Sequence, residues 1–160
     1  MPRRLAIGFA LAIGLIGVAG FVPAQAQETF TARLSWVPIS GAERGDVAGQ
    51  GSATATLTRS QLAITGSFEG LPAAATRASL HQGVAVGARG PAIAELRVTN
   101  ARDGEISSDV ELNRDQLAAL MAGQLYVQVH AERGVAPDNA VLWGWLLGSV
   151  ETSSSRRRTP

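Results

Sequence analysis

Hydrophobic and polar residues alternate one by one through most of this chain from residue 30 onward. Residues 30–36 and 53–58 show the pattern most clearly, because every second side chain is apolar and threonine, serine or arginine fills the positions between. A period of two places the apolar set on one face of a β-strand. Gly66 interrupts the third such run, which predicts a β-bulge. The predicted strands cover residues 30–36, 53–58, 62–68, 76–82, 93–98, 106–112, 125–131 and 141–150. Eight short strands at this spacing predict an all-β fold, either an immunoglobulin-like β-sandwich or a Greek-key barrel.

One short helix interrupts the strands, over about residues 114–121. Asn113 is a suitable N-cap for it and Gly123 a suitable terminator. Residues 40–50 and 83–91 are rich in glycine and polar side chains, which predicts two long loops between strands.

An uncharged apolar run of 18 residues, Leu5–Val22, follows two arginines near the N-terminus. Ala24-Gln25-Ala26 then places small residues at the two positions that a signal peptidase reads. We expect residues 1–26 to be a signal peptide cleaved after Ala26, with a periplasmic or secreted product and no transmembrane segment after cleavage. The alternative is an uncleaved anchor, because 18 residues is near the lower length limit for spanning a bilayer.

Charge argues against a nucleic-acid partner. All 14 basic residues are arginine, and removing residues 1–26 leaves 12 of them against 13 acidic residues, so the mature chain has no large basic face. Residues 151–160 are too polar to join a core and predict a disordered basic tail, whose Arg156–Arg158 run either contacts anionic material or is solvated. Residues 27–150 therefore form the predicted domain. Cysteine is absent, which excludes a thiolate nucleophile and a sulfur-ligated metal.

Three segments resemble the CHRD (chordin) domain. Residues 78–83 read Ala-Ser-Leu-His-Gln-Gly, similar to the family's His-Ile-His-x-Gly. Residues 126–130 read Tyr-Val-Gln-Val-His after a Leu/Gly helix, where the family has Tyr-Val-Asn-Val-His. Residues 142–146 read Leu-Trp-Gly-Trp-Leu, where it has Ile-Arg-Gly-Gln-Leu. The resemblance implies an immunoglobulin-like β-sandwich outside the cytoplasm, since chordin binds growth factors there. It also places Ser79 where the family has its first histidine and Trp143 where it has arginine.

The candidate site residues are Ser79, His81, Gln128 and His130, which share strand faces in two predicted strands. If those strands come close, the four side chains converge as a polar cluster. His81 and His130, the only two histidines, could then ligate zinc or copper, completed by serine, glutamine, tyrosine or a carboxylate such as Asp138 or Glu132. The other interpretation is structural, because two histidines fall below the usual ligand count of a zinc site.

No catalytic constellation is evident, since the chain lacks a Gly-x-Ser-x-Gly elbow. We therefore expect a non-enzymatic module that binds a protein or cell-envelope component, with no resident cofactor. A periplasmic metal-binding protein using His81 and His130 is the alternative.

Trp143 and Trp145 lie on one face of the last predicted strand, whose other face carries leucine. A strand that is apolar on both faces is either buried on both sides or presents a patch. The second interpretation makes the two indoles a surface for a partner, or for a second copy in a weak homo-oligomer.

Overall fold

The computed structural model describes residues 27–148 of the chain. The predicted signal peptide and the predicted basic tail lie outside the described residues. Within residues 27–148, the helices are too short or too polar to cross a bilayer. The elements are β1 (Gln27–Trp36), η1 (Gly41–Glu43), β2 (Gln50–Thr58), β3 (Gln61–Glu69), β4 (Ala75–Gln82), β5 (Ala92–Val98), β6 (Gly104–Glu111), α1 (Arg114–Met121), β7 (Leu125–Val135), β8 (Ala140–Trp145) and β9 (Leu147–Gly148).

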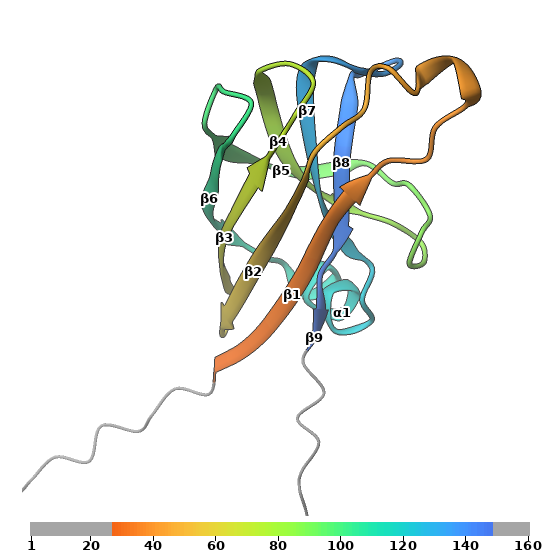
Figure 1. The fold of residues 1–160 in the computed structure, drawn as a ribbon. Coiled ribbons are helices and arrows are strands. Elements are labelled where there is room, and N and C mark those ends of the chain that lie inside the picture. Colours follow the sequence, from red (N-terminus) through yellow and green to blue (C-terminus); the bar gives the residue numbers. More distant parts are fainter. Residues whose placement is uncertain (1–26, 149–160) are drawn as a thin grey trace, which may run out of the picture.

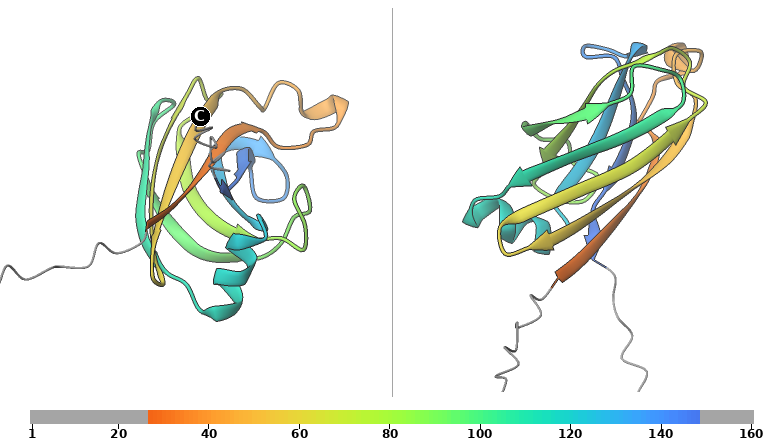
Figure 2. Two further views of the ribbon diagram at one scale, coloured as in Figure 1. Left: turned by 90° about the horizontal axis from the view of Figure 1, so that it is seen from below. Right: turned by 90° about the vertical axis from the view of Figure 1, so that its left-hand side faces the viewer.

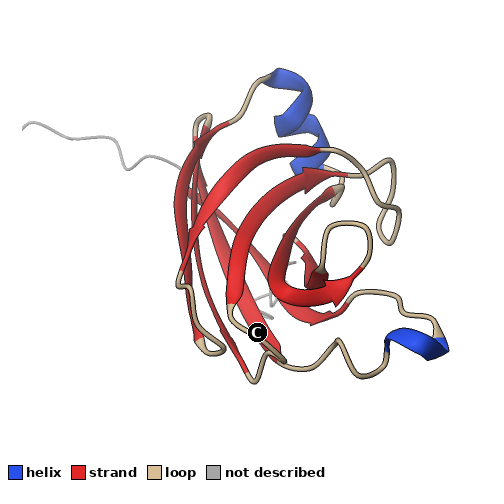
Figure 3. Cartoon of the chain, turned by 90° about the horizontal axis from the view of Figure 1, so that it is seen from above, coloured by secondary structure: helices blue, strands red, loops and turns tan. Residues whose placement is uncertain are grey.

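Eight antiparallel strands close into a barrel in the order β1-β2-β3-β6-β5-β4-β7-β8 (Figures 1 and 3). The last strand returns to the first where Ser35 lies opposite Trp143. The short β9 adds to the start of β1. The predicted all-β fold with about eight strands and one helix is confirmed, and the closed ladder is that of a barrel. The immunoglobulin-like sandwich is not confirmed. A sandwich has two sheets with open edges, whereas here β5 pairs with β6 and β8 pairs with β1, which closes the ladder.

The barrel interior holds the apolar side of each alternating strand. The largest fully buried side chains include Leu34, Leu62, Ile64, Leu80 and Leu142. The outer faces of β1, β2 and β3 are polar and exposed, as the alternation predicts. Strand β7 differs, because its first seven residues are buried on both faces. Something must therefore cover its outer face, and this is where the candidate site lies.

Helix α1 forms as the sequence predicts. Asn113 Oδ1 accepts a hydrogen bond from the Gln116 backbone N–H at 2.9 Å, and Gln116 Oε1 accepts one from the Asn113 N–H at 2.9 Å. Gly123 follows with φ +69°, a left-handed conformation that glycine adopts without strain. The helix lies at the end of the barrel where β9 also lies (Figure 2).

Two local predictions are wrong. Gly66 is not in a bulge, since it lies in register between Ala53 and Ile106. Glycine is needed at this position because the strands lie close together, and a Cβ there would lie 2.5 Å from the Ser52 carbonyl oxygen. The predicted strand 141–150 is broken at Leu146, which turns inward and separates β8 from β9.

Candidate functional site

Two neighbouring strands bring the predicted polar cluster together on the outer face of the barrel. Strand β4 supplies Ser79 and His81, and β7 supplies Gln128 and His130. Ser79 lies directly opposite Gln128 in the antiparallel ladder. All four side chains are buried, the most exposed being His81 at 8%. Their alternate neighbours along both strands fill the core, so these four point outward and are buried by the loops above them.

The hydroxyl of Ser79 lies between the two imidazoles. Its Oγ is 2.8 Å from His81 Nε2 and 3.3 Å from His130 Nε2. His81 Nδ1 is 2.9 Å from the Gly90 carbonyl oxygen, which can only accept a hydrogen bond. The proton of neutral His81 is therefore on Nδ1, and Nε2 accepts the hydrogen bond that Ser79 donates.

His130 has the same tautomer for the same reason. Its Nδ1 donates to the Asp138 carbonyl oxygen at 2.9 Å, so the Arg77 Nη2 at 3.4 Å from that nitrogen is a contact between two donors. Gln128 Nε2 lies 3.4 Å from His130 Nε2 and donates to Asp138 Oδ2 at 3.2 Å. The carboxylate fixes the orientation of the amide, because a reversed amide would place two oxygens together.

Two buried oxygens of this network lack partners. Gln128 Oε1 and Asp138 Oδ1 have no hydrogen bond within the described residues. Both are acceptors, and they belong to residues that contact His130. Buried polar atoms are usually satisfied, so an unpaired pair marks a place where a water or a cation would be stabilised. Among residues 27–148, however, no three or more His, Cys, Asp or Glu side chains gather as a metal site.

Burial lowers the pKa of both His81 and His130 below the ordinary value of 6.5, because it removes the water that would stabilise the cation. Asp138 opposes this shift and raises both pKa values, whereas Arg77 lowers both and Arg89 lowers that of His81. Both imidazoles are consequently neutral at pH 7, in agreement with their hydrogen bonds.

We expect the melting temperature to fall as the pH is lowered from about 6.5 to 5. The unfolded histidines take up protons near pH 6.5, whereas the folded ones resist protonation, so the unfolded state binds more protons in this window. Thermal unfolding monitored by circular dichroism across this range measures the effect. The double variant His81→Gln/His130→Gln should have a flatter profile. An equal slope in the variant would show that other groups carry the pH dependence.

The cluster also fastens the glycine-rich loop 83–91 to the barrel. Gly90 receives three contacts: its carbonyl accepts from His81 Nδ1, and its N–H and carbonyl meet the Tyr126 hydroxyl at 3.1 and 3.2 Å. The His81 and Tyr126 rings stack, with centroids 4.9 Å apart. A Cβ on Gly90 would overlap the Gln82 carbonyl oxygen, so this position has no room for a side chain.

Trp143 and Trp145 continue the same outer face across β8 and are half-buried. The Tyr126 ring centroid lies 5.7 Å from that of Trp143 and 4.5 Å from that of Trp145. The Arg89 guanidinium lies over the Trp143 ring at 5.9 Å, so loop 83–91 covers part of the aromatic face. The structure thus joins the two indoles to the polar cluster, and their role as a partner surface stays a prediction.

The polar cluster and the strands that carry it fall inside one matched segment. The family model of the CHRD domain matches residues 30–136 of this chain. The chain belongs to the CHRD domain family. A comparison with curated proteins finds no match. The matched segment of this CHRD domain runs from β1 to β7 and contains all four residues of the polar cluster. Asp138, Trp143 and Trp145 lie after its end.

Sequence reasoning missed Gly90, a loop residue whose backbone makes hydrogen bonds with both His81 and Tyr126. A signal existed, since Tyr126 shares a strand face with His130 and needs a partner for its hydroxyl when buried. The register between β4 and β7, which places His81 opposite Tyr126, could not be read from either strand alone.

Proposed function

We propose that this protein is an exported, non-catalytic CHRD module that binds a partner protein through the tip of loop 83–91. Membership of the family and the N-terminal apolar segment support export to the periplasm or the medium. The buried Ser79 supports a non-catalytic role, because a hydroxyl that is 1% exposed is out of reach of a substrate. The observation that carries the proposal is the apolar surface that the loop presents.

Four exposed apolar side chains lie on the three segments that meet at Gly123, and we call them the loop patch: Val84, Val86, Met121 and Leu147. Their exposed fractions are 82%, 57%, 52% and 48%. A Cβ on Gly123 would lie 3.1 Å from Leu147 and 3.8 Å from Val86, so the loop tip, the end of α1 and β9 are contiguous. Exposed apolar patches of this kind mark protein contacts.

The base of the loop is rigid, which suits a binding surface. Gly83 N–H donates to the Gln124 carbonyl at 2.9 Å, and the Gln124 amide donates to the Val84 carbonyl at 3.0 Å. At the other end, Gly90 is held by His81 and Tyr126. We infer that the buried cluster acts as a scaffold, which presents the loop patch at little entropic cost on binding.

Replacing both Val84 and Val86 with aspartate should abolish partner binding and leave the fold intact, since both side chains are exposed.

A photo-crosslinking residue at position 86, in cells that export the protein, should give an adduct whose mass identifies the partner. The adduct should disappear when Leu147 is also replaced with aspartate. A crosslinker at Thr54, on the exposed face of β2, is the matched control. An adduct that persists in the Leu147 variant would contradict the proposal. Adducts of twice the chain mass would identify a second copy as the partner.

A metal-binding function is the second candidate, and the unpaired oxygens of Gln128 and Asp138 beside His130 favour it. Zinc or copper would then be held by His81 and His130 together with oxygen ligands. Binding of either ion must raise the melting temperature of the wild type and not that of a His130 variant.

A further inference from the structure

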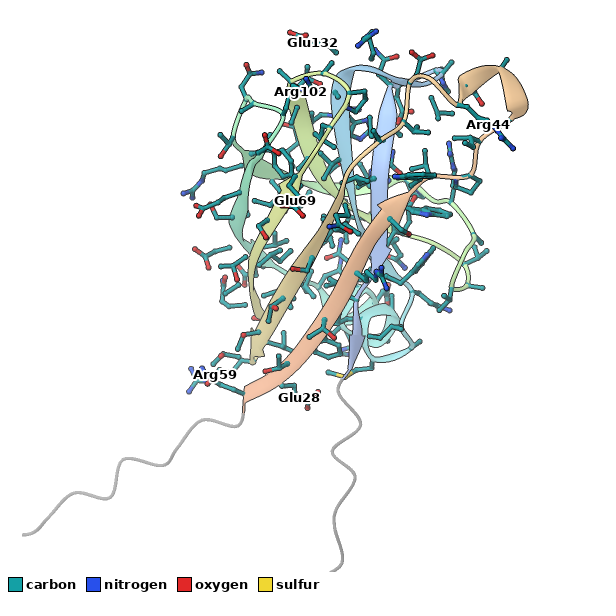
Figure 4. The ribbon with its side chains drawn as sticks, viewed as in Figure 1. Glu28, Arg44, Arg59, Glu69, Arg102 and Glu132 are labelled. Carbon is teal, nitrogen blue, oxygen red and sulfur yellow. The ribbon has the colours of Figure 1, made fainter. Side chains whose placement is uncertain are left out.

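A row of shallow hollows runs along the surface where β1, β2 and β3 approach the loop between β1 and β2. Their volumes are about 470, 340, 380 and 490 Å³, each in the range of about 300–1,000 Å³ usual for ligand sites. Gln50 lines the first three and Trp36 the last two, so adjacent hollows share walls. We call the row the Trp36 groove. Its ends lie near Glu69 and Arg44, both labelled on one side of the barrel in Figure 4.

Trp36 is a large aromatic side chain at the surface, with 55% of its area exposed. Its indole N–H donates to the Gly49 carbonyl at 2.8 Å. The hydrogen bond fixes one edge of the ring at the base of the loop, and hollows lie on both sides of the residue. A rigid, solvent-exposed indole offers a flat apolar surface that is ready for stacking.

The groove supplies polar groups beside this ring. Gln50 Nε2 donates to Glu69 Oε1 at 2.8 Å, which orients both side chains and leaves the amide oxygen and a carboxylate oxygen facing solvent. Arg33 lines the two central hollows, and its guanidinium forms no hydrogen bond or ion pair with residues 27–148. Five guanidinium N–H donors are therefore available next to two acceptors.

We infer that the Trp36 groove binds a polysaccharide chain, with one pyranose ring stacked on Trp36. A pyranose has an apolar face of C–H groups that packs on an indole, and hydroxyls at its rim that both donate and accept. The fixed amide, carboxylate and guanidinium groups of Gln50, Glu69 and Arg33 match those hydroxyls. A linear polymer also fits a groove that continues past the indole on both sides.

An extended peptide fits this surface less well. Peptides that lie along a sheet usually pair with a free strand edge. Strand β1 already pairs with β2 on one side and with β8 and β9 on the other, and β2 lies between β1 and β3. The strands that line the groove therefore offer no free sheet edge, and the lining is too polar for a row of apolar anchors.

The probes for this inference are cellohexaose, chitohexaose and xylohexaose, titrated by calorimetry against the full mature chain. At least one should bind saturably, and Trp36→Ala should weaken that binding by about tenfold or more. Trp36→Phe should retain most of the affinity because a ring remains, and Gln50→Ala should weaken it through the lost rim contact. Trp143→Phe is the matched control, since that indole lies outside the groove.

Absence of saturable binding to all three hexasaccharides, or equal affinity in wild type and Trp36→Ala, would overturn the inference. Selection of a peptide that competes for Trp36 would overturn it as well and assign the groove to peptides. The proposed protein partner binds elsewhere, so the Val84→Asp/Val86→Asp variant should bind the saccharide normally. The two proposals can therefore fail separately.

Discussion

Replacing His130 with alanine is expected to lower the free energy of unfolding by about 2–4 kcal/mol. The imidazole is 1% exposed and donates to the Asp138 carbonyl, and its Nε2 faces both Ser79 and Gln128. Alanine leaves the Asp138 carbonyl without this donor, removes one contact each from Ser79 and Gln128, and also leaves a cavity. Urea denaturation, with the unfolding slope unchanged, measures the difference.

His130→Asn is the matched variant, because the asparagine amide can replace Nδ1–H and keep the hydrogen bond to Asp138. It should recover part of the loss, whereas Ser107→Ala on the exposed face of β6 should change little. Repeating the series with zinc and with copper separates the two roles of the cluster. An equal loss with and without metal supports the scaffold role. A wild-type melting temperature that rises with metal, against an unchanged His130→Ala, would instead establish metal binding.

The alternation along the chain was sufficient to predict the strands. Phe30, Ala32 and Leu34 point into the barrel as a period of two requires, and the helix begins after Asn113 as its cap predicts. The choice between a sandwich and a closed barrel was not predictable, because Ser35 and Trp36 are the only described residues of β1 that pair with β8, and two residue pairs leave little signal in sequence. The break at Leu146 was not predictable either, since a leucine fits both a continuous strand and an inward turn.

The polar cluster could be predicted because its members recur at a spacing of two on two strands. Its function as a scaffold could not, since the receiving group is the backbone of Gly90, which carries no side-chain signature. Similarly, the alternation gave Trp36 the same periodic position as buried Leu34, yet Trp36 is 55% exposed. Strand β1 ends at Trp36, and the ring lies over the loop instead of the core.

These observations link the buried histidines to the surface. Neutral His81 and Tyr126 hold Gly90, and Gly90 ends the loop that carries Val84 and Val86. A substitution at the base of the loop should consequently alter the position of the loop patch, although Gly83 and Gly90 are not part of that patch. The strongest such change is one that forces the loop away from β4 and leaves the rest of the barrel intact.

Gly90→Ala is expected to release loop 83–91 and to destabilise the fold by about 2–4 kcal/mol. The added Cβ would overlap the Gln82 carbonyl oxygen and would lie 2.9 Å from Gly83 Cα, and backbone atoms cannot rotate aside as a side chain can. Relief requires the loop to lift, which breaks the hydrogen bonds from His81 and Tyr126. The far-ultraviolet circular dichroism spectrum should remain that of a β-barrel, because the strands are unaffected.

Release should also uncover Trp143, over which Arg89 lies, and Trp145, whose ring lies beside Gly83. Iodide quenching, measured in a Trp36→Phe background so that only these two indoles emit, should increase in Gly90→Ala, and the crosslink from position 86 should weaken. Gly45→Ala is the control, because a Cβ at that position of the other long loop meets nothing within 4 Å. If Gly90→Ala matches the wild type in stability and quenching, the loop is not held by Gly90, and the buried cluster would have no structural connection to the proposed binding surface.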